Sequence, residues 1–191
     1  MVEKIARPRG RPREFDPDEV LDRAVEVFWR LGYDAADTEA LAKAMGLTKP
    51  SIYAAFGNKE QLFLKALERY GKKAGADMQA ALSTAPSVRA GVAALFQGMA
   101  ERVSGVGGAA GCLHTCVAIQ SAGAMAPVRE IVEAGIAARD RVFADYLREG
   151  VARGELPADF PVERRASLMN DLLHGLALRA RAGVSLEDLR A

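Results

Sequence analysis

Apolar residues recur every three or four positions along most of the chain, which is the spacing of amphipathic helices. The first such stripe predicts a helix over residues 16–31, with Asp16 as its N-cap and Pro17 at its first position. Gly32 predicts the end of this helix. The stripe consists of Val20, Leu21, Ala24, Val27, Phe28 and Leu31.

Two short helices and one long helix are predicted next. The short helices cover about 38–45 and 49–56, and each has a polar N-cap before it and a glycine after it, Gly46 or Gly57. The long helix covers about 59–82.

The rest of the chain keeps the helical periodicity. A glycine-rich stretch interrupts it at 105–111, and Ser185 with Asp188 has the pattern of a capping box close to the C-terminus. No strand or internal repeat is indicated, so the predicted fold class is all-α. The further helices are predicted at about 86–103, 112–121, 127–153 and 162–182.

Composition narrows the class of protein. Half of the 191 residues are apolar and 27% are charged, which excludes a disordered, collagen-like or low-complexity chain. No run of about eighteen apolar residues occurs, so we expect no membrane span. Two cysteines are too few to form a disulfide framework in a chain of this length. Proteins without such a framework are typical of the reducing cytoplasm, which is therefore the expected location.

The net charge of +1 conceals a basic N-terminus. Residues 1–13 carry five basic side chains against Glu3 alone, so an anionic partner would meet this arm first. A solvated, solubilising tail is the alternative interpretation.

The spacing of the first three helices is that of a helix-turn-helix, whose second helix enters the DNA major groove. Ala42 allows close packing, Gly46 allows the turn, and Leu47 and Ile52 anchor the pair. A similar turn also occurs in helical bundles that do not bind DNA. The side chains left for the groove are Thr48, Lys49, Ser51 and Tyr53.

Three segments, 28–33, 41–51 and 52–63, resemble the N-terminal domain of TetR-family transcriptional regulators, and the resemblance covers about 16–64. It implies a homodimer that binds a palindromic DNA operator, represses, and is released by a small-molecule effector. It implies neither an enzyme nor a cofactor. The DNA contacts that it implies come from Thr48, Lys49, Pro50, Ser51, Tyr53 and Lys59.

The resemblance divides the chain into a basic arm (1–15), a helix-turn-helix domain (16–58) and a ligand-binding and dimerisation domain (59–191). Two residue types depart from the family pattern: Pro50 replaces a frequent glycine, and Ala54-Ala55 replace an aromatic or histidine. The operator sequence therefore cannot be transferred. Packing of Tyr53 in the core and simple solvation of Lys59 remain alternatives to DNA contact.

The arm segment 8–13, Pro-Arg-Gly-Arg-Pro-Arg, resembles the core of an AT-hook. Arginines flanking a small residue lie in a narrow, electronegative minor groove, so Arg9, Arg11 and Arg13 are candidate DNA contacts. A loosely held tail is the alternative.

Cys112 and Cys116 lie four residues apart near a predicted helix start, with His114 between them. Inert core packing, a thiol that senses electrophiles or oxidants, and a soft-metal site are the three interpretations of the cysteines. No metal site is assigned, because a third ligand would have to come from elsewhere in the chain.

The effector cavity is expected between the helices that begin near 59, 87 and 112. Its predicted lining is mostly apolar, which suits a small, largely hydrophobic effector, or a thiol-reactive one if Cys112 is the sensor. The predicted lining residues are Phe96, Met99, Val103, Cys112, Leu113, Cys116, Val117, Gln120 and His174.

The helices at 127–153 and 162–182 are expected to form the homodimer interface, because the second is apolar on more than one face. The alternatives to a ligand-responsive repressor are a helical small-molecule-binding protein or enzyme without DNA binding, and an architectural DNA-binding protein without a ligand. The glycine run at 105–111 follows a helix rather than a strand, so we do not interpret it as a dinucleotide site.

Overall fold

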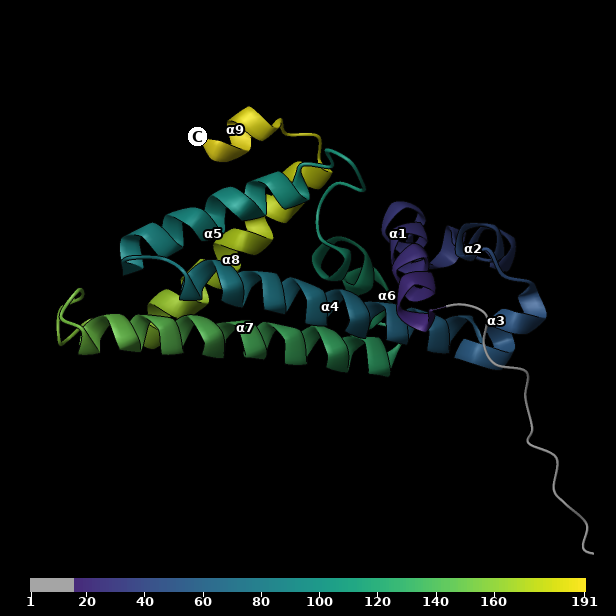
Figure 1. The fold of residues 1–191 in the computed structure, drawn as a ribbon, viewed down its shortest axis with the longest axis horizontal. Coiled ribbons are helices and arrows are strands. Elements are labelled where there is room, and N and C mark those ends of the chain that lie inside the picture. Colours follow the sequence, from purple (N-terminus) through teal and green to yellow (C-terminus); the bar gives the residue numbers. More distant parts are fainter. Residues whose placement is uncertain (1–15) are drawn as a thin grey trace, which may run out of the picture.

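The computed structural model of the protein describes residues 16–191, and every regular element in that range is helical (Figure 1). The predicted all-α fold class is confirmed. The elements are α1 (Pro17–Ala35), α2 (Thr38–Met45), α3 (Lys49–Phe56), α4 (Lys59–Ser83), α5 (Val88–Val103), the π-helix η1 (Leu113–Ala118), α6 (Ile119–Ala122), α7 (Ala126–Ala152), α8 (Val162–Arg181) and α9 (Leu186–Arg190).

The helices of the N-terminal third begin where the sequence predicted, and each of the following has a side-chain N-cap. The side chain of Asp16 accepts from the amide of Asp18, that of Asp37 from Ala40, and that of Asn58 from Gln61 in a reciprocal capping box. The sequence predicted that α1 ends at Gly32, which is three residues too early. Gly32 does leave the helix, with φ 79°, but one further turn follows it to Ala35.

The segment predicted as one helix over 112–121 differs from expectation. It forms the π-helix η1 and the short α6, and the wider π turn changes which side chains share a face. After α8, Ser185 caps α9 through the amide of Asp188 at 3.1 Å, and Leu189 of α9 is buried.

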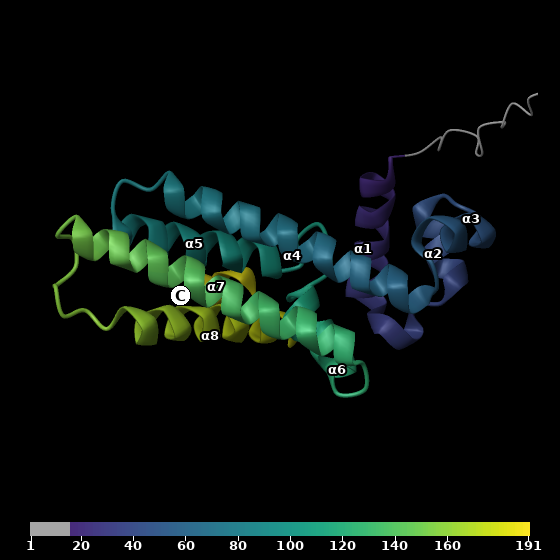
Figure 2. The same ribbon diagram turned by 90° about the horizontal axis from the view of Figure 1, so that it is seen from below.

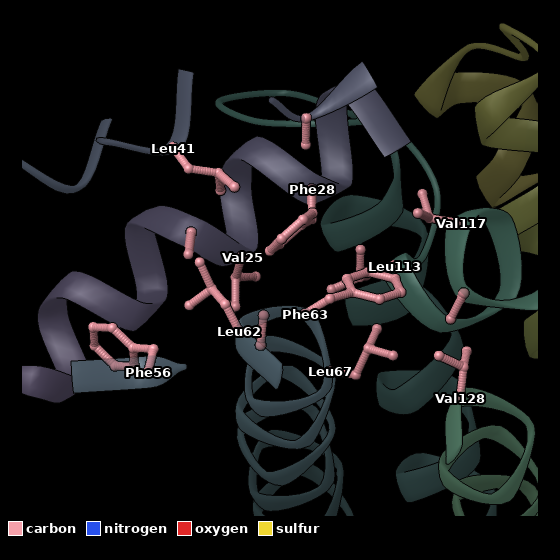
Figure 3. Close-up of a cluster of buried hydrophobic side chains, with 14 of the residues drawn as sticks. Val25, Phe28, Leu41, Phe56, Leu62, Phe63, Leu67, Leu113, Val117 and Val128 are labelled. Carbon is pink, nitrogen blue, oxygen red and sulfur yellow. The ribbon is translucent and has the colours of Figure 1, made fainter. Parts of the chain in front are cut away.

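Two hydrophobic clusters form the interior. The first joins α1–α4 to η1, α6 and the start of α7, and Phe28, Phe63 and Leu113 are fully buried at its centre (Figure 3). The second lies among α5, α7, α8, α9 and the end of α4. Helix α4 enters both clusters, through Leu62–Leu67 in the first and through Met78 and Leu82 in the second.

Figures 1 and 2 show α1–α3 at one end of the molecule and the long helices α4, α5, α7 and α8 beside one another at the other end. Arg69 of α4 fixes α1 by donating to Asp22 at 2.9 Å and to Asp18 at 2.7 Å. The hydrogen bond from Arg69 lowers the pKa of Asp22. No helix within residues 16–191 combines the length and the apolar character that a membrane span requires.

Candidate nucleic-acid interface and internal cavity

Helices α2 and α3 pack as a helix-turn-helix. Leu41 and Met45 of α2 and Ile52 and Phe56 of α3 are buried in the first cluster. The chain turns between the helices at Gly46, whose φ of 66° is left-handed and suits glycine. The outer side of α3 is therefore fixed by packing on its inner side.

Tyr53 lies on this outer side, where its residue is 49% exposed. Its hydroxyl is 3.4 Å from Oγ1 of Thr38 on α2. Ile52 and Phe56 take the buried positions beside it, which places Tyr53 on the surface rather than in the core.

The N-terminus of α3 presents short polar groups and one cation. Thr48 Oγ1 accepts from the amide of Ser51 at 3.3 Å and lies 2.9 Å from the Ser51 hydroxyl. Lys49 and Pro50 are exposed, and Lys49 Nζ is 3.7 Å from a carboxylate oxygen of the exposed Glu39. Such an exposed pair contributes little, so Lys49 is available to a phosphate group.

Lys59 begins α4, directly after the loop that ends α3. Its Nζ donates to the carbonyl of Asp34 at 3.2 Å and lies 4.7 Å from the centre of the Tyr33 ring. The side chain is thus held in place beside α1 rather than freely solvated. The arm residues Arg9, Arg11 and Arg13 lie outside the residues that the structure describes.

A cavity of about 760 Å³ lies among α4, α5, α7, α8 and the start of η1. Most of its wall is apolar, with Leu67, Met78, Leu95, Val142 and Leu173 among the lining residues. It is within the size range of small-molecule sites in proteins. Of the nine predicted lining residues, the structure brings Met99, Cys112 and His174 to this cavity.

The other six lie elsewhere, in part because η1 is a π-helix. Leu113 and Val117 turn into the first cluster, while Cys116 and Val103 are buried in the second. Phe96 lines a separate cavity of about 420 Å³ beside Leu168. Gln120 is exposed and donates to the carbonyl of Cys116 at 2.8 Å.

A polar cluster that the sequence analysis did not find forms one part of the cavity wall. Arg139 of α7 donates from Nε to Oδ1 of Asn170 at 2.9 Å and from Nη2 to Nε2 of His174 at 2.7 Å. A guanidinium only donates, so Nε2 of His174 must accept and that ring is neutral. Burial and the nearby guanidinium of Arg139 lower the pKa of His174.

His114 and Tyr70 complete this cluster. His114 is buried, and its Nε2 donates to the carbonyl of Leu67 at 2.9 Å. Burial lowers the pKa of His114 and raises that of Tyr70, whose ring meets the His114 ring edge-on at 5.2 Å.

The sequence did contain a signal for Arg139. This arginine lies on the apolar stripe of its helix, three residues from both Ile136 and Val142. Charged side chains are rare on the buried side of a helix unless they have a partner. A cation on a buried stripe is a candidate functional residue.

The two cysteines are free and buried, and they face different surroundings. Cys112 lines the cavity, whereas the thiol of Cys116 lies 3.5 Å from the carbonyl of Ala177. Burial raises the pKa of the Cys116 thiol. Across the described range 16–191, no three histidine, cysteine, aspartate or glutamate side chains gather as a metal site.

Helices α7 and α8 expose apolar side chains on their outer surface. Leu172 is 51% exposed and Leu178 is 53% exposed, and Ile136 and Leu168 are also on the surface. These are the helices that the sequence predicted as the dimer interface.

The N-terminal and C-terminal parts of the chain match two protein families. Residues 20–66 match the family described as bacterial regulatory proteins, tetR family. Residues 83–189 match the family described as tetracyclin repressor-like, C-terminal domain.

Full-length relatives and solved structures show the same similarity. The chain is 32% identical to the HTH-type transcriptional repressor ComR of Escherichia coli K12, over 97% of this chain and 89% of ComR. It is 30% identical to the repressor BdcR of the same strain, over 100% of this chain and 92% of BdcR. A cysteine mutant of the TetR family regulator CifR, complexed with 26-bp double-strand operator DNA, superimposes with a TM-score of 0.84 at 38% identity, over 94% of each chain.

Proposed function

The chain belongs to the tetR family of bacterial regulatory proteins, and on that premise we propose a ligand-responsive repressor that binds a palindromic operator as a homodimer. Members of this family are transcriptional regulators rather than enzymes, which removes the enzyme alternative. DNA contact would take place in the cytoplasm. The observation that supports the proposal most is the outer side of α3, with Tyr53 exposed and Thr48, Lys49 and Lys59 beside it.

The chemistry of this surface suits duplex DNA. The tyrosine ring and the short hydroxyls can reach base edges, while the lysines and the amides at the start of α3 can hold phosphate oxygens. Relatives support this assignment, because CifR is described in complex with operator DNA. Thr48, Lys49, Pro50, Ser51, Tyr53 and Lys59 are therefore the proposed DNA contacts, together with the arm.

We propose that the exposed faces of α7 and α8 pair with their copies around a twofold axis. Leu168 is 44% exposed and Leu172 is 51% exposed, so burying what remains of each would stabilise that interface by about half of the roughly 1.5–3 kcal/mol that a fully exposed leucine contributes. The twofold axis would place two α3 helices about 34–36 Å apart, one turn of DNA.

We further propose that a small effector fills the cavity of about 760 Å³ and moves α4. Leu67 and Tyr70 of α4 line the cavity, and Leu62 and Phe63 of the same helix pack against the helix-turn-helix. A displacement of α4 would therefore change the separation of the two recognition helices. The apolar part of the wall suits the hydrophobic part of an effector.

A thiol-reactive effector is the second candidate, and the placement of Cys112 on the cavity wall is the observation that favours it. Cys116 is less suited, because burial raises the pKa of its thiol and so lowers the thiolate fraction. If Cys112→Ser releases DNA as readily as the parent after treatment with N-ethylmaleimide, the thiol-sensor proposal is wrong.

Selection of bound sequences from random duplex DNA by the purified protein tests the DNA proposal. We expect an enriched palindrome. The free energy of binding to it should be weaker by about 1–3 kcal/mol in Tyr53→Ala and in Lys49→Ala. Lys73→Ala is the control, because Lys73 lies about 21 Å along α4 from Lys59 and so away from the proposed DNA contacts. Failure to enrich any sequence, or equal affinities for all four proteins, would contradict the proposal.

A further inference from the structure

The cavity contains a guanidinium whose hydrogen-bonding capacity is only partly used. Arginine has five N–H donors, and Arg139 gives one from Nε to Asn170 and one from Nη2 to His174. Three donors remain without an acceptor among residues 16–191: both on Nη1 and the second on Nη2. These form the end of the guanidinium that pairs with a carboxylate through two parallel hydrogen bonds.

The surroundings of Arg139 do not supply that carboxylate. The ion pairs within residues 16–191 do not include Arg139 or Arg102, the second arginine of the lining. Asp140 is adjacent in sequence, but its carboxylate accepts from Nδ2 of Asn170 at 2.8 Å. Among the described residues 16–191, the guanidinium of Arg102 has one hydrogen-bond partner, the sulfur of Met99 at 2.9 Å from Nη2.

The acidic residues of the lining do not neutralise this cluster either. Glu68 and Asp77 are exposed residues of α4, and the exposed Lys72 of the same helix lies among them. Arg139 is half-buried and lies with the buried His114 and Cys112. Burial lowers the pKa of Arg139 and of both histidines, and for Arg139 and His174 the nearby carboxylate of Asp140 opposes this shift without cancelling it.

Space for an anion exists beside the unused donors. Gly135 of α7 has no side chain, and a Cβ there would lie 3.9 Å from Nη1 of Arg139 and 3.7 Å from Nδ1 of His114. The remaining wall, along α4, α5 and α8, is largely apolar. The cavity therefore combines one cationic, hydrogen-bonding site with a hydrophobic chamber.

We propose that the cavity binds a small amphipathic monoanion, whose carboxylate pairs with Nη1 and Nη2 of Arg139 and whose apolar body lies against α4 and α5. Arg102, exposed at the cavity edge, adds positive potential that favours entry of an anion. The role of this anion as the effector rests on the proposed function, whereas its binding does not.

Three probes with the same alkyl chain and different head groups test the proposal on the full-length protein: decanoate, 1-decanol and decylamine. Displacement of the fluorescent anion 1-anilinonaphthalene-8-sulfonate reports binding. We expect decanoate to bind at least about tenfold more tightly than 1-decanol, because a charge-assisted pair with a half-buried arginine replaces a neutral contact, and decylamine to bind most weakly. Equal affinities for decanoate and 1-decanol would overturn the proposal without any mutation.

Substitutions then assign the anion to Arg139. Arg139→Gln should remove the preference for decanoate over 1-decanol, and Arg139→Lys should retain only part of it, because lysine keeps the charge without the paired donors. Arg141→Gln is the matched control, an exposed arginine of the same helix. A preference that persists in Arg139→Gln, with far-UV circular dichroism unchanged, would overturn the assignment; if Arg139→Gln does not fold, the Arg139→Lys result decides.

Release of a selected operator, measured with the same probes, separates this inference from the proposed function. Arg139-dependent binding of decanoate without release would support the anion site and contradict its regulatory role. Release by 1-decanol with no preference for decanoate would support the proposed function and contradict the anion site.

Discussion

Replacing Gly71 by alanine should destabilise the protein relative to the same replacement at Gly75, one turn further along α4. Both glycines lie inside the helix, so alanine adds about 1 kcal/mol of helix propensity at either position. A Cβ at Gly71 would lie 2.9 Å from Cε1 of His114, whereas a Cβ at Gly75 meets no neighbouring group within 4 Å. The two variants share the backbone effect and differ in this contact.

The His114 ring has little freedom to move away from a new methyl group. It is 4% exposed, it is hydrogen-bonded to the carbonyl of Leu67 at 2.9 Å, and it packs edge-on against Tyr70. Overpacking of such a site costs about 1–3 kcal/mol. At about 2–4 °C per kcal/mol for a chain of this length, Gly75→Ala should have a Tm about 2–12 °C above that of Gly71→Ala.

Thermal unfolding followed by far-UV circular dichroism measures this difference. All proteins must be compared at one concentration, because the proposed dimerisation would make the Tm depend on concentration. Gly75→Ala should also melt at or above the Tm of the parent protein. Equal Tm values for the two variants would show that His114 can yield, and would refute the argument that α4 and η1 are tightly packed here.

Four further predictions follow from other contacts. Asn170→Ala removes the bonds to Arg139, Ile136 and Asp140 at a residue 1% exposed, and should lower the free energy of unfolding in urea by about 3 kcal/mol. His174 and His114 have pKa values below 6.5 in the folded protein, so the unfolded chain binds more protons as the pH falls. The free energy of unfolding should therefore decrease below about pH 6.5, and urea titrations should show a smaller decrease in His174→Gln. Leu172→Glu should give a monomer in sedimentation, and an unchanged dimer would argue against the α7–α8 interface. Deletion of residues 1–15 should weaken operator binding and flatten its salt dependence by about 0.9 log units per lost phosphate contact, and an unchanged slope would favour the tail interpretation.

Local signals predicted the first four helices well. Asp37, Thr48 and Asn58 each cap a helix through their own side chain, and Gly46 adopts the left-handed conformation that its position requires. These signals act over three or four residues, so the sequence alone contains them. The polar surface of α3 followed for the same reason, because the buried positions of Ile52 and Phe56 determine which side of that short helix faces outwards.

The residues that line the cavity could not be predicted from such local signals. Arg139 meets His174 across 35 residues of sequence, and Tyr70 meets His114 across α4 and η1, so both pairs depend on how helices pack. The π-helix also departs from the α-helical periodicity that the prediction assumed, and Leu113 packs in the first cluster whereas His114 lines the cavity. The expected hydrophobic site therefore has a cationic part, and the position of Arg139 on the apolar stripe of its helix marks this arginine in the sequence but not the residues that it meets.

The contacts between the cavity and the helix-turn-helix indicate how a ligand signal could reach DNA. Tyr70 lines the cavity, and its ring meets the ring of Trp29 of α1 at 5.1 Å. Arg181 of α8 donates to the carbonyl of Trp29 at 3.2 Å, so α1 is contacted by α4 and α8, two of the helices that line the cavity. A hundredfold loss of operator affinity requires about 2.7 kcal/mol of coupling. Hydrogen bonds contribute about 0.5–1.5 kcal/mol each and aromatic pairs a similar amount, so loss of both contacts would supply about 1–3 kcal/mol, a range that includes the coupling required.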